Sequence, residues 1–288
     1  MRFARYSLFV FALALIAGCT GIRPAPESAS KAKPRIALAL GGGAARGFAH
    51  VGVIKALEAQ GIVPDIVVGT SAGSVVGALY AAGYNGFELQ QLAFKLDEAN
   101  FTDWTLPDRG VLRGEALQKM INDAVRQRPL DKLGKPFAAV ATDLQSGEEV
   151  VFRTGNTGMA VRASSSVPGV FQPVQINGRE YVDGGLVSPV PVRAARQMGA
   201  DMVIAVDISA VPRNGKTSGT LDILLQTFSI MGQSINRYQL KEADVVIRPS
   251  ADIRSTDFQA KHQAILEGEK AVAGQLPQLR DRLRLSSR

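Results

Sequence analysis

The segment Gly69-Thr70-Ser71-Ala72-Gly73 places a serine midway between two glycines. A β-branched apolar run at 66–68 precedes it, and a stretch of small residues with helical character follows at 75–82. This strand–turn–helix context is the one that the G-x-S-x-G nucleophile elbow requires. Gly69 and Gly73 remove side chains that would crowd the bend. The pattern predicts a nucleophile at Ser71, and the alternative is a turn in which Ser71 only caps the following helix.

A glycine-rich loop, Gly41-Gly42-Gly43-Ala44-Ala45-Arg46-Gly47, lies between an apolar segment and a predicted helix. Backbone N–H groups in such a loop form an anion site. The loop lacks the Gly-Lys-Ser/Thr ending of a P-loop, and Arg46 stands where a dinucleotide fingerprint needs glycine or alanine. We therefore expect an oxyanion hole for Ser71 rather than a nucleotide site, built from Gly41, Gly42, Gly43, Ala44 and Arg46. The Arg46 side chain either adds positive charge there or is solvated.

Four segments follow one another between residues 36 and 209: the glycine loop, the serine turn, a small-residue run at 163–171 that ends in Pro168-Gly169-Val170-Phe171, and Asp183-Gly184-Gly185. Together they resemble the patatin-like phospholipase family, most closely its bacterial and neuropathy-target-esterase-type branch. The resemblance implies a three-layer α/β fold with helices on both faces of a central, mostly parallel sheet. It also implies a lipid acyl hydrolase of the phospholipase A or lysophospholipase type, with Ser71 as nucleophile, Asp183 as base and no metal or cofactor.

Histidine is scarce, which bears on how Ser71 could be activated. Of the two histidines, only His262 follows the acid in the order usual for a serine–histidine–acid triad, and its neighbourhood predicts a solvated helix. We expect a Ser71–Asp183 dyad instead, with His50 packed inside the protein. An aspartate at its ordinary pKa is a weak base, but burial beside an apolar substrate raises that pKa. The alternative for Asp183 is an Asx turn that stabilises its own backbone.

The N-terminus has the features of a bacterial lipoprotein signal. Arg2 and Arg5 precede an apolar run at 8–16 that is too short to span a membrane, and Ile16-Ala17-Gly18-Cys19 resembles a lipobox. We predict a signal peptide at 1–18, lipidation of Cys19 and a flexible tether at 19–34. The predicted location is the bacterial cell envelope, and the outer membrane if the source has one. The alternatives are an uncleaved anchor and an ordinary secretory signal.

Apolar periodicity and turn residues predict the elements that position these groups. Strands are expected at 36–40, 66–68, 136–142, 149–153, 174–176, 180–182, 201–208 and 245–247. Helices are expected at 48–60, 75–82, 87–96, 114–125, 191–198, 221–243 and 258–283, the last broken at Pro277. The first two strands should be neighbours, so that the glycine loop and Ser71 meet at one sheet edge. The apolar face of 221–243 should pack against the protein, and 100–113 is a lid, an acyl-chain wall or a self-packed loop.

The composition limits the remaining function classes. The chain has 288 residues, 46% hydrophobic, and a net charge of +7 without a basic stripe, so nucleic-acid binding is not expected. One cysteine excludes an intramolecular disulfide. We expect a catalytic core at 35–209, completed by 210–288. The expected partners are a phospholipid or other fatty-acyl ester and a membrane. The competing functions are a general carboxylesterase or thioesterase on soluble esters, and a non-catalytic lipid-binding lipoprotein.

Overall fold

The computed structural model describes residues 33–96, 103, 109–210, 219–249, 253–254 and 257–286. Cys19, with the predicted signal peptide and nearly all of the predicted tether, lies outside the described residues. So do most of the segment 100–113 and residues 211–218. No helix of the described residues combines the length and the apolar composition needed to cross a membrane.

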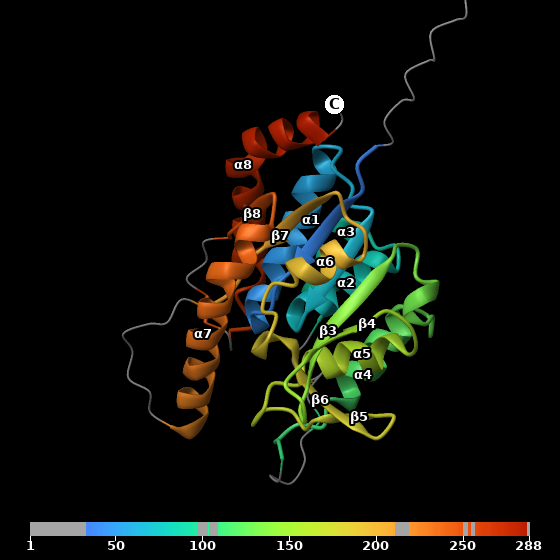
Figure 1. Cartoon of the computed structure of the whole chain (residues 1–288), viewed down its shortest axis with the longest axis vertical. Coiled ribbons are helices and arrows are strands. Elements are labelled where there is room, and N and C mark those ends of the chain that lie inside the picture. The colour runs from blue at the N-terminus through green and yellow to red at the C-terminus, as the bar shows by residue number, and fades with distance from the viewer. Residues whose placement is uncertain are drawn as a thin grey trace, which may run out of the picture. The chain divides into compact units, whose positions relative to one another are not determined.

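A mixed sheet forms the centre of the described part of the chain (Figure 1). Its hydrogen-bonded path runs β5-β6-β3-β2-β1-β7-β8, and β4 pairs with β3. The strands β1, β2, β3, β7 and β8 are parallel, whereas β4 and β6 pair antiparallel with β3, and β5 with β6. The bounds are β1 Ile36–Leu40, β2 Ile66–Thr70, β3 Phe137–Asp143, β4 Glu149–Phe152, β5 Val174–Ile176, β6 Arg179–Asp183, β7 Met202–Val206 and β8 Val245–Ile247.

Helices cover both faces of this sheet. Their bounds are α1 Phe48–Ala59, α2 Ala72–Ala81, α3 Gly86–Lys95, α4 Glu115–Ala124, α5 Thr157–Ser164, α6 Val192–Gln197, α7 Thr220–Gln239 and α8 Lys261–Ser286. Alternate residues of each strand point to opposite faces. Leu38 and Leu40 pack with α1, α2 and α8, whereas Ala37 and Ala39 pack with α6. The central strands are buried on both sides, as continuous apolar runs predict, and the expected three-layer α/β fold is confirmed.

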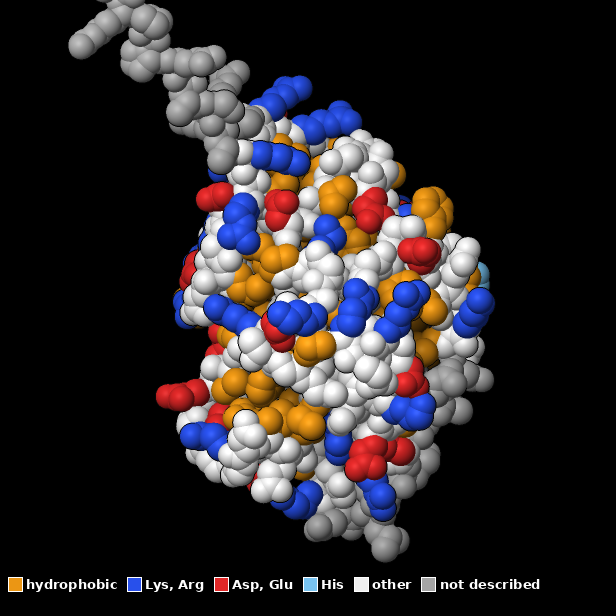
Figure 2. All heavy atoms as spheres, turned by 90° about the vertical axis from the view of Figure 1, so that its right-hand side faces the viewer, with side chains coloured by type: hydrophobic (Ala, Val, Ile, Leu, Met, Phe, Trp, Pro, Cys, Tyr) orange, Lys and Arg blue, Asp and Glu red, His pale blue; other side chains and the backbone are white. Residues whose placement is uncertain are grey.

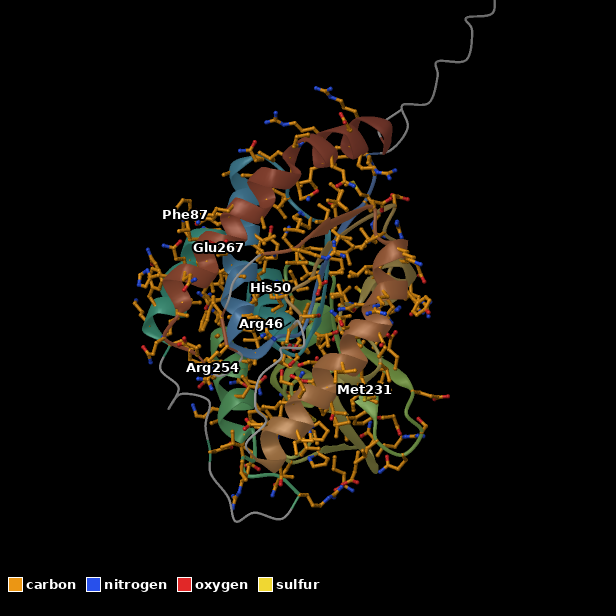
Figure 3. The ribbon with its side chains drawn as sticks, turned by 90° about the vertical axis from the view of Figure 1, so that its left-hand side faces the viewer. Arg46, His50, Phe87, Met231, Arg254 and Glu267 are labelled. Atoms are coloured by element: carbon orange, nitrogen blue, oxygen red, sulfur yellow. The ribbon has the colours of Figure 1, made fainter. Side chains whose placement is uncertain are left out.

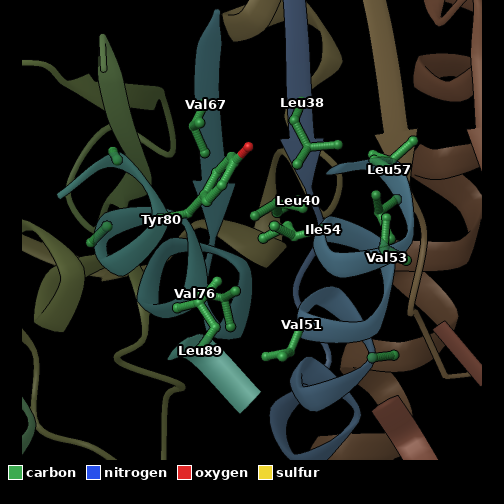
Figure 4. Packing of buried hydrophobic residues seen from close by; sticks show 14 of the residues in the cluster. Leu38, Leu40, Val51, Val53, Ile54, Leu57, Val67, Val76, Tyr80 and Leu89 are labelled. Atoms are coloured by element: carbon green, nitrogen blue, oxygen red, sulfur yellow. The ribbon is translucent and has the colours of Figure 1, made fainter. Parts of the chain in front are cut away.

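Each face of the sheet has its own hydrophobic core. The larger core lies between the sheet and helices α1 and α2 (Figure 4). Helix α8 packs onto the outer side of α1 through two glycines. A Cβ on Gly52 would lie 1.9 Å from the Ile265 carbonyl oxygen, and one on Gly268 would lie 2.1 Å from the Ala49 carbonyl oxygen. The absence of side chains at these positions therefore permits the two helices to approach closely.

Helices α8 and α5 differ most from the sequence predictions. Helix α8 starts at Lys261 rather than at 258 and continues through Pro277, so the predicted break is wrong. Proline removes one helical N–H donor and kinks a helix, but α8 is held along its length by packing against α1 and β8. Helix α5 was not predicted. It is only eight residues long, and the Asn156 side chain caps its N-terminus by accepting the Met159 N–H.

The hairpin that precedes Asp183 has the predicted turn. Asn177 and Gly178 have φ angles of 51° and 80°, as a type I′ turn requires, and they join β5 to β6. On the face shown in Figure 2, basic and acidic side chains are interspersed among small apolar patches. Basic side chains form a row across the middle of that face, and acidic side chains lie mainly above and below it.

Candidate active site

The glycine loop and the Ser71 turn meet at the carboxyl ends of β1 and β2. These strands are parallel neighbours, as predicted, with Leu40 opposite Gly69. A Cβ added to Gly42 would lie 3.2 Å from the Cβ of Ser71. The loop backbone therefore faces the serine directly, and Gly42 leaves the space between them open.

Ser71 has the strained backbone of a nucleophile elbow. Its φ of 54° and ψ of −125° are conformations that residues with a Cβ rarely adopt. A Cβ on Gly69 would lie 2.3 Å from the Gly73 carbonyl oxygen, and one on Gly73 would lie 2.1 Å from the Leu40 carbonyl oxygen. Both glycines are therefore steric requirements of the turn. Ser71 is the N-cap residue of α2, at the positive end of that helix.

The pairing of β2 and β6 with β3 brings Asp183 close to Ser71. The β3 residues 139–140 pair with both β2 and β4, and residues 141–142 pair with both β4 and β6. Strands β2 and β6 must therefore share the edge of β3 opposite β4. Thr70 lies opposite Val140, and Asp183 lies opposite the next residue, Ala141. The two strands approach that point from opposite directions and bring Ser71 and Asp183 together.

The Asp183 carboxyl is buried, with 3% of the residue exposed. Its Oδ1 accepts the Gly185 N–H at 2.7 Å, which is the Asx-turn contact. Oδ2 is buried without a hydrogen-bond partner among the described residues. Burial raises the pKa of Asp183 to about 6, although the nearby Ser71 side chain and the Gly185 N–H oppose that rise. One oxygen thus stabilises the turn, and the other is left to accept a proton.

The donors of the glycine loop differ from the prediction. The Gly41 N–H donates to Val206 O at 3.0 Å and the Gly42 N–H to Pro189 O at 2.9 Å. Neither N–H is available for an oxyanion, so this part of the prediction is wrong for both residues. The N–H groups of Gly43 and Ala44 have no acceptor among the described residues. Ala72, directly after Ser71, begins α2 and has no partner within the helix for its N–H.

Arg46 lies in the site and is also held by backbone. Its Nε donates to Ile208 O at 2.8 Å, and its guanidinium also reaches Ile253 O. It lines the same cavity as Ser71 and Asp183. The sequence left two alternatives for this side chain, a positive charge in the site or a solvated arginine. Neither describes it fully, because the guanidinium links the glycine loop to the segment that follows β7.

His50 is a site residue that sequence reasoning placed only in the core. It lies in the first turn of α1 beside Arg46 (Figure 3), fully buried. Because a carbonyl only accepts, His50 Nε2 donates to Gly41 O, at 2.8 Å. Burial lowers the pKa of His50 to about 4, so the ring is neutral at neutral pH. Its proximity to the glycine loop in sequence was the signal that could have identified this anchoring role.

His262 lies elsewhere, as expected. It is exposed on α8 and stacks on the Phe94 ring at a centroid distance of 4.1 Å. Among the described residues, no group of three or more His, Cys, Asp or Glu side chains could hold a metal ion.

Two cavities meet at Ser71. One, of about 140 Å³, contains Asp183, Gly43 and Arg46 and is bounded on its outer side by Leu225 and Phe228 of α7. The other, of about 160 Å³, is lined almost wholly by apolar side chains. The site therefore has a polar side and an apolar side, with the serine between them.

Comparisons with known proteins identify the family of this chain. The family model described as patatin-like phospholipase matches residues 38–196. An uncharacterized NTE family protein of Mycobacterium tuberculosis is 38% identical over 202 residues, covering 68% of this chain and 54% of that protein. Lysophospholipase NTE1 of Meyerozyma guilliermondii is 34% identical over 182 residues, covering 61% of this chain and 13% of that protein. The chain spans about half the length of the first of these relatives and far less of the second.

A solved structure shares the fold. The crystal structure of VipD from Legionella pneumophila has a TM-score of 0.58 at 14% identity, covering 85% of this chain and 67% of that chain. At this identity the likeness concerns the fold alone.

Proposed function

Because the chain belongs to the patatin-like phospholipase family, we propose that it hydrolyses a fatty-acyl ester of a lipid, with Ser71 as nucleophile and Asp183 as base. One observation carries this proposal. Among the residues that the structure describes, the buried Oδ2 of Asp183 has no hydrogen-bond partner, and its carboxyl is close enough to the Ser71 side chain for that side chain to affect its pKa. A raised pKa makes the carboxylate a better base.

The reaction has two steps. Asp183 takes the Ser71 proton while Oγ attacks the ester carbonyl, and the carbonyl oxygen becomes an oxyanion. We assign the oxyanion to the N–H groups of Gly43, Ala44 and Ala72, and loss of one such donor typically costs about 3 kcal/mol of transition-state stabilisation. The proton on Asp183 passes to the leaving alcohol. Water then attacks the acyl-Ser71 ester with Asp183 again as base, which releases the fatty acid and restores the serine.

A lipid substrate is favoured over a soluble ester by the surface next to the site. Helix α7 turns Leu225 and Phe228 toward the polar cavity. The neighbouring face of α7 carries a stripe of exposed apolar side chains at helical spacing: Ile223, Leu224, Ile230, Met231 and Tyr238. The sequence predicted that the apolar face of 221–243 packs against the protein, which is wrong for two of its members, Leu224 and Met231, because both are exposed. The name of the yeast relative, a lysophospholipase, also supports a phospholipid or lysophospholipid.

The membrane attachment is part of the same proposal. The lipobox-like segment ending at Cys19 supports a lipid anchor in the bacterial envelope, in the outer membrane where there are two. Such an anchor would hold the site close to lipid. A general esterase acting on soluble acyl esters remains the second candidate, because the same dyad would serve it.

Fluorophosphonate labelling of the purified protein tests the dyad. We expect one adduct, located on Ser71 by peptide mass spectrometry and absent in Ser71→Ala and Asp183→Asn. Asp143→Asn is a matched control, because Asp143 is another buried aspartate at a strand end but pairs with Arg179. It should keep the label. Equal labelling of folded Asp183→Asn and the parent protein would remove Asp183 as base, and no labelling of Ser71 would favour a lipid-binding protein.

A further inference from the structure

A third cavity, of about 410 Å³, lies between α1, α2, α3 and α4. Its wall is mainly apolar. In Figure 4, Val76 of α2 and Leu89 of α3 lie across from Val51 of α1, and all three line it. Its charged lining residues are Lys95, Lys119 and Asp123, which lie on exposed sides of α3 and α4. Apolar volume of this size is uncommon in a close-packed interior unless something occupies it.

This cavity continues the apolar cavity at Ser71. The two share a ring of lining residues: Phe48, Val75, Val76, Leu96 and Met120. We call this ring the neck. An apolar path therefore runs from the serine, through the neck, to the space between the four helices. The path follows α2, since Ala72, Val75, Val76 and Leu79 line it in succession.

We propose that the acyl chain of the substrate occupies this path, and that the neck sets the preferred chain length. This inference rests on the proposed function. From Ser71 to Leu79 the helix rises about 12 Å. An extended alkyl chain covers that distance with roughly ten carbons, at about 1.25 Å per carbon. Chains of this length or longer reach the third cavity, whereas a butyryl group stays at the serine.

The same geometry orients the ester. The acyl chain leaves the serine toward the apolar side, so the alcohol faces the opposite cavity, which holds Arg46 and Asp183. A leaving lysolipid or headgroup would then depart beneath α7.

Met120→Trp tests the neck, because Met120 is half-buried on α4 and a larger ring there narrows the path. The substrates are the p-nitrophenyl esters of butyrate, decanoate and palmitate. We expect the ratio of kcat/KM for palmitate to that for butyrate to fall about tenfold or more, as when two or more methylenes lose their burial. Because Met120 also lines the cavity at Ser71, only the ratio is interpreted for this variant, and circular dichroism serves as its control for folding. Ala124→Leu, which reduces only the third cavity, should lower palmitate hydrolysis and spare butyrate.

Binding without turnover separates this inference from the proposed function. The fluorescence of cis-parinaric acid, a long-chain fatty acid, reports binding to Ser71→Ala. Addition of Met120→Trp should weaken that binding about tenfold or more. An unchanged chain-length ratio together with unchanged parinaric acid binding would overturn the inference. If no ester is hydrolysed but binding depends on Met120, the proposed function fails and the acyl site stands.

Discussion

The hydroxyl of Ser164 accepts a hydrogen bond from the backbone N–H of Ser71 at 2.9 Å. The same hydroxyl donates to Val140 O of β3 at 2.5 Å and is fully buried at the end of α5. Ser71 has a positive φ, so its turn must be held by its surroundings. Ser164 stabilises this turn, because its hydroxyl links Ser71 to β3, the strand with which Asp183 also pairs.

We expect Ser164→Ala to fold and to lower kcat by about ten- to a hundredfold with little change in KM, since small displacements of a reacting group are costly. Loss of the buried hydrogen bond should also reduce the free energy of unfolding by about 1–3 kcal/mol. Steady-state kinetics on p-nitrophenyl butyrate and urea unfolding measure the two effects.

Ser166→Ala is the matched control. Its hydroxyl is also buried, in the same segment, but donates to Arg162 O instead of accepting the Ser71 N–H. It should lose stability in the same range while keeping kcat within about threefold. If both alanine variants lowered kcat equally, the effect would be one of stability and not of positioning.

The activity should depend on the ionisation of Asp183. The base must be the carboxylate, and burial raises the pKa of Asp183 to about 6. We therefore expect kcat/KM to be low below that pH, to rise through about 6 and to level off above it. A profile of kcat/KM for a neutral ester measures this. A flat profile between about pH 5 and 8, in protein that stays folded, would contradict the role.

The sequence predicted the parts of the site that depend on local chemistry. Ser71 and the glycine loop each lie between a strand and a helix, and the residue types alone require tight turns there. The type I′ hairpin before Asp183 was predictable for the same reason. Each of these features is fixed within about ten residues of chain.

What the sequence could not predict depends on distant partners. The Gly42 N–H is taken by Pro189 O, which lies far along the chain, so the donors of the loop could not be assigned locally. The meeting of Asp183 with Ser71 follows from the pairing of β2 and β6 on one edge of β3. The apolar stripe of α7 has the same periodicity whether it packs or is exposed, and only the position of the helix decides between them.

His50 should make the stability depend on pH. Its pKa is lowered to about 4, below the unfolded value of 6.5, so the unfolded chain takes up a proton first as the pH falls. The stabilisation is complete above about 6.5 and is lost as the pH falls toward 4, with a magnitude on the order of 3 kcal/mol. Asp183 has the opposite effect on the pH dependence of stability. Its raised pKa favours folding at low pH, and this contribution is lost as the pH rises through about 6.

His50→Gln separates the two groups, since glutamine can still donate to Gly41 O but does not titrate. We expect urea unfolding of the parent protein to lose more stability between about pH 7 and 5 than the variant does. Equal losses in the two proteins would mean that His50 is not the titrating group.

The exposed stripe of α7 should matter only when the substrate is in a bilayer. Figure 3 labels Met231 on α7, on the outside of the molecule. We expect Ile230→Glu with Met231→Glu to lower hydrolysis of phosphatidylglycerol vesicles by about tenfold or more, because two apolar side chains no longer enter the lipid. Hydrolysis of p-nitrophenyl butyrate should be unchanged. Leu266→Glu, an equally exposed apolar position on α8, is the control and should alter neither rate.

The close approach of α1 and α8 can be tested with two glycines that differ only in their surroundings. A Cβ at Gly52 would meet the Ile265 carbonyl at 1.9 Å, whereas a Cβ at Gly274 of α8 would meet nothing within 4 Å. Gly52→Ala must therefore push the helices apart, and we expect it to cost about 2–3 kcal/mol or more of unfolding free energy. Gly274→Ala should instead stabilise the protein by about 0.5–1 kcal/mol, the difference in helix propensity. Urea unfolding compares them, and a Gly52→Ala variant as stable as the parent would show that α8 does not rest on α1 through this glycine.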